Sequence, residues 1–132
     1  MFFVIPLIMK PLTRISTFLL FVLPFMAVGQ SAAIDVALGK GNATELGTYL
    51  SPKVDLSILG EDVSLTGGEA TRYLEAFFTK NSVRSYKRAH LTPATNGRSS
   101  YSLGDLVTAT GTYRVYLYFD TNQKISEIRI EK

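Results

Sequence analysis

The chain of 132 residues has no cysteine and no tryptophan, and it has a single histidine, His90. Without cysteine it forms no disulfide and carries no lipid-anchoring thiol behind a leader. Apart from that histidine, carboxylates are the only metal ligands left, and Glu61 and Asp62 are the only adjacent acidic pair. A hairpin turn accounts for this pair, so we predict no metal site.

The common catalytic motifs are also missing. The sequence contains no G-x-S-x-G, no P-loop and no G-x-G-x-x-G, which removes the usual hydrolase, phosphate and dinucleotide signatures. Histidine titrates near neutrality and is a common acid–base group. Strand alternation predicts that His90 shares a face with Tyr86 and the permanent cation of Arg88, so we interpret it as a partly exposed strand residue. We predict neither a cofactor nor a catalytic residue.

The first 29 residues differ in character from the rest. Lys10 and Arg14 precede an apolar run from Ile15 to Val28, and the small residues Ala27 and Gly29 lie at its end. Basic, apolar and small residues in this order are typical of a secretory signal. The run is shorter than the ~20 residues that span a bilayer, which makes a membrane anchor the weaker interpretation.

We therefore predict that residues 1–29 are a signal peptide and that residues 30–132 form one exported domain, either periplasmic or extracellular. Met9 is a better candidate start than Met1, because it places the two basic residues directly before the apolar run. Two of the 14 basic residues lie in the leader, which leaves 12 against 11 acidic ones. This balance predicts no nucleic-acid binding, and leader removal leaves no stable membrane anchor.

Apolar spacing predicts two short helices followed by a hairpin. Ile34, Ala37 and Leu38 recur at helical spacing, and a second helix begins at Asn42 and stops before Pro52. Residues 53–59 and 63–66 alternate between apolar and polar and are separated by a glycine-containing turn at residues 60–62.

The clearest helix covers residues 66–81. Thr66 and Glu69 have the spacing of a capping box at its start. One apolar stripe predicts that the helix lies on a large flat surface. The stripe contains Ala70, Tyr73, Leu74, Phe77 and Phe78.

The remaining chain is rich in strand patterns, at residues 83–92, 98–108, 112–119 and 124–132. We break the longest of these stretches at residues 108–111, where Gly111 supplies the turn, and interpret Gly104 as a bulge. The element order predicts an α+β fold, in which a strongly curved antiparallel sheet wraps around the N-terminal helices and one long amphipathic helix.

Three stretches of this sequence resemble domain-of-unknown-function family 4783. They are residues 39–81, GTYRVYLYF (111–119) and ISEIRIEK (125–132), so the resemblance covers nearly the whole mature chain. Its most specific pieces are GNATEL through VDLSI (41–58) and GTYRVY (111–116). The family consists of short secreted bacterial proteins with the cone-shaped, cystatin-like fold of nuclear transport factor two and its relatives. The resemblance implies this fold and no activity, because the family has no assigned reaction.

Two surfaces are candidates for a function. Tyr49, Tyr73 and Tyr101 are candidates for the mouth of the cone, where a ligand would bind. The strand at residues 112–119 is loaded on both faces, and its apolar face predicts packing under the helices. The other face carries Arg114, Tyr116 and Tyr118, residue types enriched at interface hot spots. That face is either the interface of a homodimer or a wet surface.

Two functions follow from this sequence. The first is a secreted non-catalytic domain that acts through binding or assembly. The alternative is a small enzyme or an apolar-ligand carrier that uses the cone. A closed pocket of about 300 Å³ or more with a buried polar group would favour the alternative. A cone filled by Leu74, Phe77 and Phe78 would favour the first function.

Overall fold

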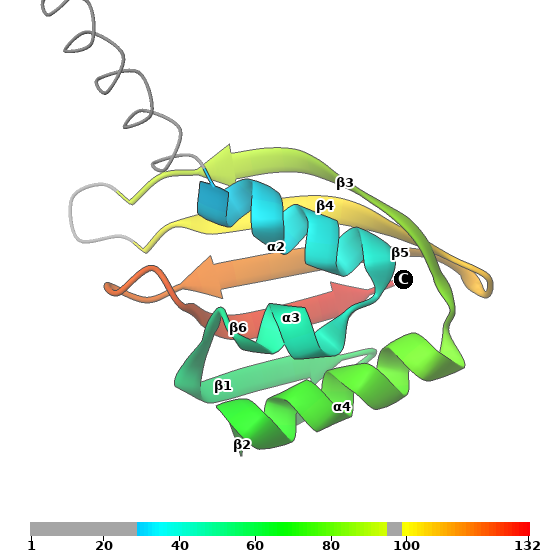
Figure 1. Ribbon diagram of the computed structural model, residues 1–132, viewed down its shortest axis with the longest axis horizontal. Coiled ribbons are helices and arrows are strands. Elements are labelled where there is room, and N and C mark those ends of the chain that lie inside the picture. The colour runs from blue at the N-terminus through cyan, green and yellow to red at the C-terminus, as the bar shows by residue number, and fades with distance from the viewer. Residues whose placement is uncertain (1–28, 95–98) are drawn as a thin grey trace, which may run out of the picture. The chain divides into compact units, whose positions relative to one another are not determined.

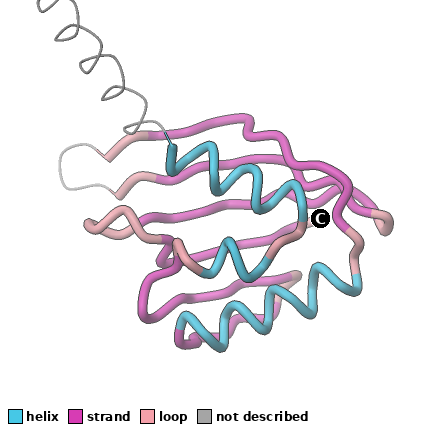
Figure 2. Tube along the Cα trace, viewed as in Figure 1, coloured by secondary structure: helices cyan, strands magenta, loops and turns pink. Residues whose placement is uncertain are grey.

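The computed structural model describes residues 29–94 and 99–132. The chain divides after Ser31, and the unit described here is Ala32–Lys132 together with the start of its first helix. The predicted signal peptide lies outside the described residues except for Gly29, as does Arg98 at the start of one predicted strand. The element order is that expected from the sequence (Figures 1 and 2).

In the described ranges, two helices come first, followed by two strands, a third helix and four strands. The helices are α2 (Gly29–Lys40), α3 (Ala43–Gly47) and α4 (Gly67–Lys80). The strands are β1 (Leu50–Ile58), β2 (Glu61–Thr66), β3 (Val83–Thr92), β4 (Tyr101–Thr108), β5 (Gly111–Phe119) and β6 (Ile125–Glu131).

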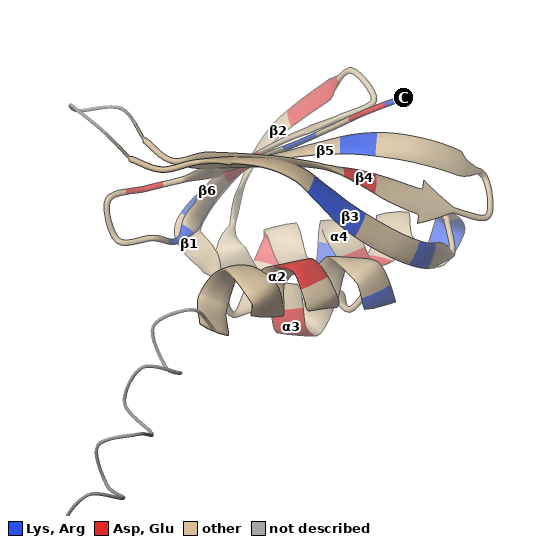
Figure 3. Cartoon of the chain, turned by 90° about the horizontal axis from the view of Figure 1, so that it is seen from above, with Lys and Arg blue, Asp and Glu red and all other residues tan. Residues whose placement is uncertain are grey.

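The six strands form one open sheet in the order β2-β1-β6-β5-β4-β3. Four of the pairings are antiparallel, and the β1–β6 pairing is parallel. All three helices lie on one side of this sheet, as Figure 3 shows, and the opposite side carries no described element. We call the uncovered side the outer face.

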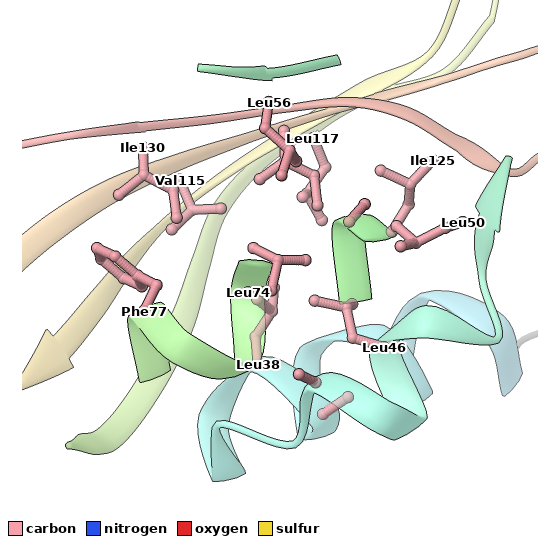
Figure 4. Packing of buried hydrophobic residues seen from close by; sticks show 14 of the residues in the cluster. Leu38, Leu46, Leu50, Leu56, Leu74, Phe77, Val115, Leu117, Ile125 and Ile130 are labelled. Carbon is pink, nitrogen blue, oxygen red and sulfur yellow. The ribbon is translucent and has the colours of Figure 1, made fainter. Parts of the chain in front are cut away.

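The core lies between the helices and the inner face of the sheet. Side chains of α4 point at the sheet, with Leu74 and Phe77 facing residues of β1, β5 and β6 in Figure 4. The capping box at Thr66 and Glu69 begins this helix as predicted, and both of its reciprocal hydrogen bonds form. The β5 residues predicted to pack under the helices are all buried, namely Tyr113, Val115, Leu117 and Phe119.

Strand β3 contains two bulges that the sequence interpretation missed. Its pairing with β4 skips one residue at Arg84 and another at Ala89. The second bulge reverses the alternation, so His90 lies opposite Leu103 on the outer face. Tyr86 and Arg88 lie on the inner face, where Arg88 pairs with Asp35 of α2. The expectation that His90 shares their face is therefore wrong.

Gly104 is not the bulged residue, because the extra residue is on the facing strand. A Cβ atom built at Gly104 would overlap the phenol ring of Tyr86 and would lie 2.7 Å from the carbonyl oxygen of Lys87. Glycine is needed here because the Tyr86 ring crosses the strand at this point.

Candidate functional site

The outer face of β3, β4, β5 and β6 places the predicted interface residues in a regular grid. Directly paired residues of neighbouring strands point to the same side of a sheet. Tyr116 of β5 therefore stands between Leu103 of β4 and Arg129 of β6, near the middle of the face. Tyr118 stands one row away, between Tyr101 and Glu127.

Aromatic rings form a continuous row at one end of this grid. The rings of Tyr101 and Tyr118 stack with centroids 5.8 Å apart, and the ring of His90 is 6.0 Å from that of Tyr101. The His90 ring nitrogen Nε2 lies 2.7 Å from the Thr92 hydroxyl, which fixes the ring on its strand. Three strands thus contribute one aromatic surface, in which Tyr101 and Tyr118 are half-buried and His90 is exposed.

Charged side chains form the next-but-one row. Lys87, Asp105, Arg114 and Glu131 lie side by side on β3, β4, β5 and β6. The guanidinium of Arg114 is 3.4 Å from the Asp105 carboxylate. The signs alternate across the sheet, so the row is neutral as a whole.

A shallow hollow of about 320 Å³ continues the outer face toward β1 and β2. Asp55 accepts a hydrogen bond from Ser64 there at 2.8 Å, and Glu127 accepts one from Arg129 at 3.1 Å. The hydrogen bond to Glu127 raises the pKa of Arg129. These charges are paired within the face, and no group of three or more potential metal ligands occurs in the described ranges.

The three tyrosines predicted to line the cone mouth do not come together. Tyr101 points to the outer face, because it is paired with Tyr118. Tyr49 precedes the first residue of β1, where its carbonyl oxygen accepts a hydrogen bond from the Ile125 amide at 2.8 Å. Tyr73 lines a groove with Ile58 at the opposite end of β1. Strand alternation explains why Tyr101 lies on the other face, and the length of β1 explains why Tyr49 and Tyr73 are far apart.

The pairing of Tyr101 with Tyr118 in the aromatic row could have been predicted from the sequence. A two-residue loop, Ala109 and Thr110, joins β4 to β5 and pairs Thr108 with Gly111. Counting outward from that pair sets Tyr101 against Tyr118. His90 could not be added by counting, because the bulge at Ala89 leaves no mark in the sequence.

A groove of about 500 Å³ lies on the helix side, where α4 ends beside the β1–β2 hairpin. The Tyr73 hydroxyl donates to Glu61 at 3.1 Å, and this bond raises the pKa of Tyr73. At the far wall Asn81 accepts hydrogen bonds from Thr110 at 2.6 Å and from Tyr113 at 3.3 Å. No local sequence pattern predicts this amide–hydroxyl cluster, because its residues come from separate parts of the chain.

One buried polar group on the inner face, the hydroxyl of Tyr86, lacks a hydrogen bond within the described ranges. Burial, with the nearby Asp35 carboxylate, raises the pKa of Tyr86. Burial also raises the pKa of Asp35, against the opposing effect of Arg88 at 3.4 Å. These groups lie under α2, where the Tyr86 ring packs across Gly104.

The architecture places the chain in a broad structural class. It is similar to an uncharacterized protein of Silicibacter pomeroyi DSS-3 with a cystatin-like fold, at 8% identity, a TM-score of 0.57 and coverage of 76% of this chain and 71% of that one. It is also similar to the protein Rd1NTF2_04 with long sheet, at 11% identity, a TM-score of 0.60 and coverage of 76% and 94%. The fold is therefore a cystatin-like α+β cone.

Within that structural class, the comparisons identify one family. The model of the domain of unknown function DUF4783 matches residues 31–131. A DUF4783 family protein of Bacteroides fragilis YCH46 is 36% identical, with a TM-score of 0.70 over 76% of this chain and 95% of its own. The chain belongs to the DUF4783 family, as the resemblance in its sequence indicated. No curated protein matches it.

No helix in the described ranges is long and apolar enough to cross a membrane.

Proposed function

We propose that the protein is an exported, non-catalytic module that acts by assembly, and that the outer face of its sheet pairs with the same face of a second copy. The observation that supports this proposal most is that one face, which no described helix covers, carries both a row of contacting aromatic rings and a row of alternating charges. Aromatic and arginine side chains are the typical anchors of protein interfaces.

The charge row is complementary to itself under two-fold symmetry. A two-fold axis in the plane of contact, running between β4 and β5, sets β4 of one copy on β5 of the other and β3 on β6. Asp105 then meets Arg114 of the other copy, and Lys87 meets Glu131. Each charge faces the opposite sign, which favours this pairing over a shifted one.

The same axis pairs the aromatic rows. Tyr101 of one copy meets Tyr118 of the other, and Leu103 meets Tyr116. Leu103 and Tyr116 thus lie at the centre, with the aromatic row toward one end and the charge row toward the other. An apolar centre with charged groups toward the rim is the usual arrangement of a stable interface. A stable dimer needs about 800 Å² from each copy.

The filled interior of the cone favours this function over the enzyme or carrier alternative. Leu74, Phe77 and Phe78 are all buried in the core where a cone pocket would otherwise lie. Phe77 and Phe78 pack edge to face at 6.0 Å, and Phe77 and Tyr113 do so at 5.6 Å. An apolar ligand would have to displace these rings.

Light scattering of Tyr116→Glu tests the assembly. We expect the wild type to have the mass of a dimer and the variant that of a monomer, because each introduced carboxylate would face Leu103 of the other copy in a poorly solvated seam. Thr79→Glu is the matched control, since it adds the same charge on the exposed side of α4. A wild type that is monomeric at high concentration contradicts the proposal.

A charge swap tests the orientation. Lys87→Glu should weaken the dimer, and adding Glu131→Lys should restore it. Within one copy these residues are three strand spacings apart, about 14 Å, so the rescue does not arise inside a monomer. Weakening without rescue would mean that the two faces meet in another orientation.

A further inference from the structure

The groove beside the β1–β2 hairpin is an independent candidate for binding a small molecule. Its volume of about 500 Å³ lies within the range of small-molecule sites. It lies on the helix side of the sheet, away from the outer face, so it does not depend on the assembly proposed above. Its walls are formed by Ile58, Leu59, Tyr73, Ala76, Phe77 and Tyr113, and polar groups come from Glu61, Lys80 and Asn81.

Leu59 places an apolar side chain at the rim of the groove, although its backbone conformation is unfavourable for leucine. It forms the two-residue loop of the hairpin with Gly60, and both residues have positive φ angles, 51° and 90°. A two-residue loop of this kind favours Asn or Asp followed by Gly, and a branched side chain at positive φ is strained. The side chain of Leu59 is nevertheless 52% exposed beside the groove. Folding alone does not explain a leucine here.

Lys80 gives the groove a free positive charge. Within residues 29–94 and 99–132 its ammonium group has no ion-pair partner. Glu61, the one acidic residue of the lining, accepts the hydrogen bond from Tyr73. Tyr73 and Lys80 are seven residues apart on α4, which separates their positions by about 10.5 Å along the axis. An anion at Lys80 therefore stays clear of the Glu61 carboxylate.

The polar wall at the far end is already satisfied. The Asn81 side chain, 7% exposed, accepts from Thr110 and Tyr113 and donates to the Phe77 carbonyl at 3.0 Å. It holds the Tyr113 ring in place, and its carbonyl oxygen is already used by two hydroxyl groups. The groove thus offers one free cation. Apart from Glu61 and Asn81, which are hydrogen-bonded within the fold, its other walls are apolar or aromatic.

We infer that this groove binds a small anionic amphiphile, with its apolar chain against Leu59 and Phe77 and its acidic head at Lys80. A charged head and a short apolar chain match a free cation at one position and apolar walls at the others. The ligand occupies the groove outside the cone interior, so Phe77 stays in the core while it binds.

Titration with decanoate and with decanol tests this inference, because the two probes share a chain and differ in charge. We expect saturable shifts of backbone amide resonances at Leu59, Phe77 and Lys80 with decanoate. Lys80→Gln should weaken decanoate binding about tenfold, and decanol should bind no better to the wild type than to this variant. Lys53→Gln, the same change on an exposed residue of β1, should leave binding unchanged.

Leu59→Asn separates binding from folding. Asparagine suits the hairpin loop, so the melting temperature should rise, whereas loss of the apolar rim should weaken decanoate binding. A higher melting temperature with unchanged affinity would overturn the inference. So would equal binding of decanol and decanoate, or no saturable shift up to roughly 5 mM decanoate.

Discussion

Tyr86 has a buried polar group, its side-chain hydroxyl, that lacks a hydrogen bond within the described part of the chain. A buried polar group without a hydrogen bond costs free energy, so removing it should cost nothing. We expect Tyr86→Phe to keep the free energy of unfolding or to raise it by up to about 1 kcal/mol.

Tyr113→Phe is the matched control, because that hydroxyl is bonded to Asn81. It should lower the free energy of unfolding by about 1–2 kcal/mol, measured by urea denaturation. A Tyr86→Phe variant that loses as much as Tyr113→Phe would show that the hydroxyl of Tyr86 has a partner.

Phe77 tests the core at the same scale. It is 8% exposed and packs edge to face against both Phe78 and Tyr113. We expect Phe77→Ala to destabilise the protein by about 3–5 kcal/mol, as large aromatic truncations in a core do. A loss below about 1 kcal/mol in urea denaturation would mean that α4 does not pack on the sheet.

Residue patterns predicted the inner face better than the outer one. Burial on the inner face of β5 follows from the alternation of its apolar residues, which the sequence displays directly. The face of Tyr101 follows by counting from the two-residue loop between β4 and β5. The face of His90 does not, because one inserted residue at Ala89 changes the side on which the later residues of β3 lie. Nothing in the composition of β3 indicates which residue is skipped.

At the scale of elements, the β5–β6 turn is held by one carboxylate. Asp120 accepts hydrogen bonds from the amides of Asn122 at 2.8 Å and Lys124 at 3.0 Å, and from the Ser51 hydroxyl. It therefore ties the turn to the start of β1. The bond from Ser51, supported by those from the amides, lowers the pKa of Asp120 below its usual 3.8.

This shift predicts how stability depends on pH. A carboxyl group with a lowered pKa stabilises the fold above its unfolded pKa, and the contribution is lost as the pH falls through the folded value. We expect the melting temperature of the wild type to fall below pH 3.8, and Asp120→Asn to lack this part of the fall.

Asp35→Asn provides a comparison of opposite sign. The raised pKa of Asp35 means that its contribution favours the fold at low pH and is lost as the pH rises through the folded value. The melting temperature of Asp35→Asn should therefore fall more steeply than that of the wild type as the pH is lowered. If both variants followed the wild-type profile, the two carboxyl groups would not differ between the folded and unfolded states.

The helices and strands themselves were predictable because each carries a local signal. The capping box, the stripe of α4 and the turn at Gly111 all depend on residues close in sequence. The parallel pairing of β1 with β6 does not, since these strands are separated by most of the domain. The same holds for the groove, whose lining comes from the hairpin, α4 and β5.

For the whole molecule, export is the first expectation to test. A basic segment, an apolar run and small residues precede Gln30 in the order of a secretory signal. We expect the exported protein to begin at Gln30, as intact mass spectrometry of the secreted or periplasmic fraction would show. An uncleaved chain in the membrane fraction would overturn both the predicted address and the near-neutral charge of the mature chain.

The two bulges of β3 also affect whether a strand from another molecule can add to this edge of the sheet. This strand is ten residues long and lies at the border of an open sheet, a template onto which a foreign strand could add. Skipped residues at Arg84 and Ala89 break the even spacing of its outward amides and carbonyls. An added strand could bond only in short interrupted stretches, so growth into fibrils is blocked at this edge.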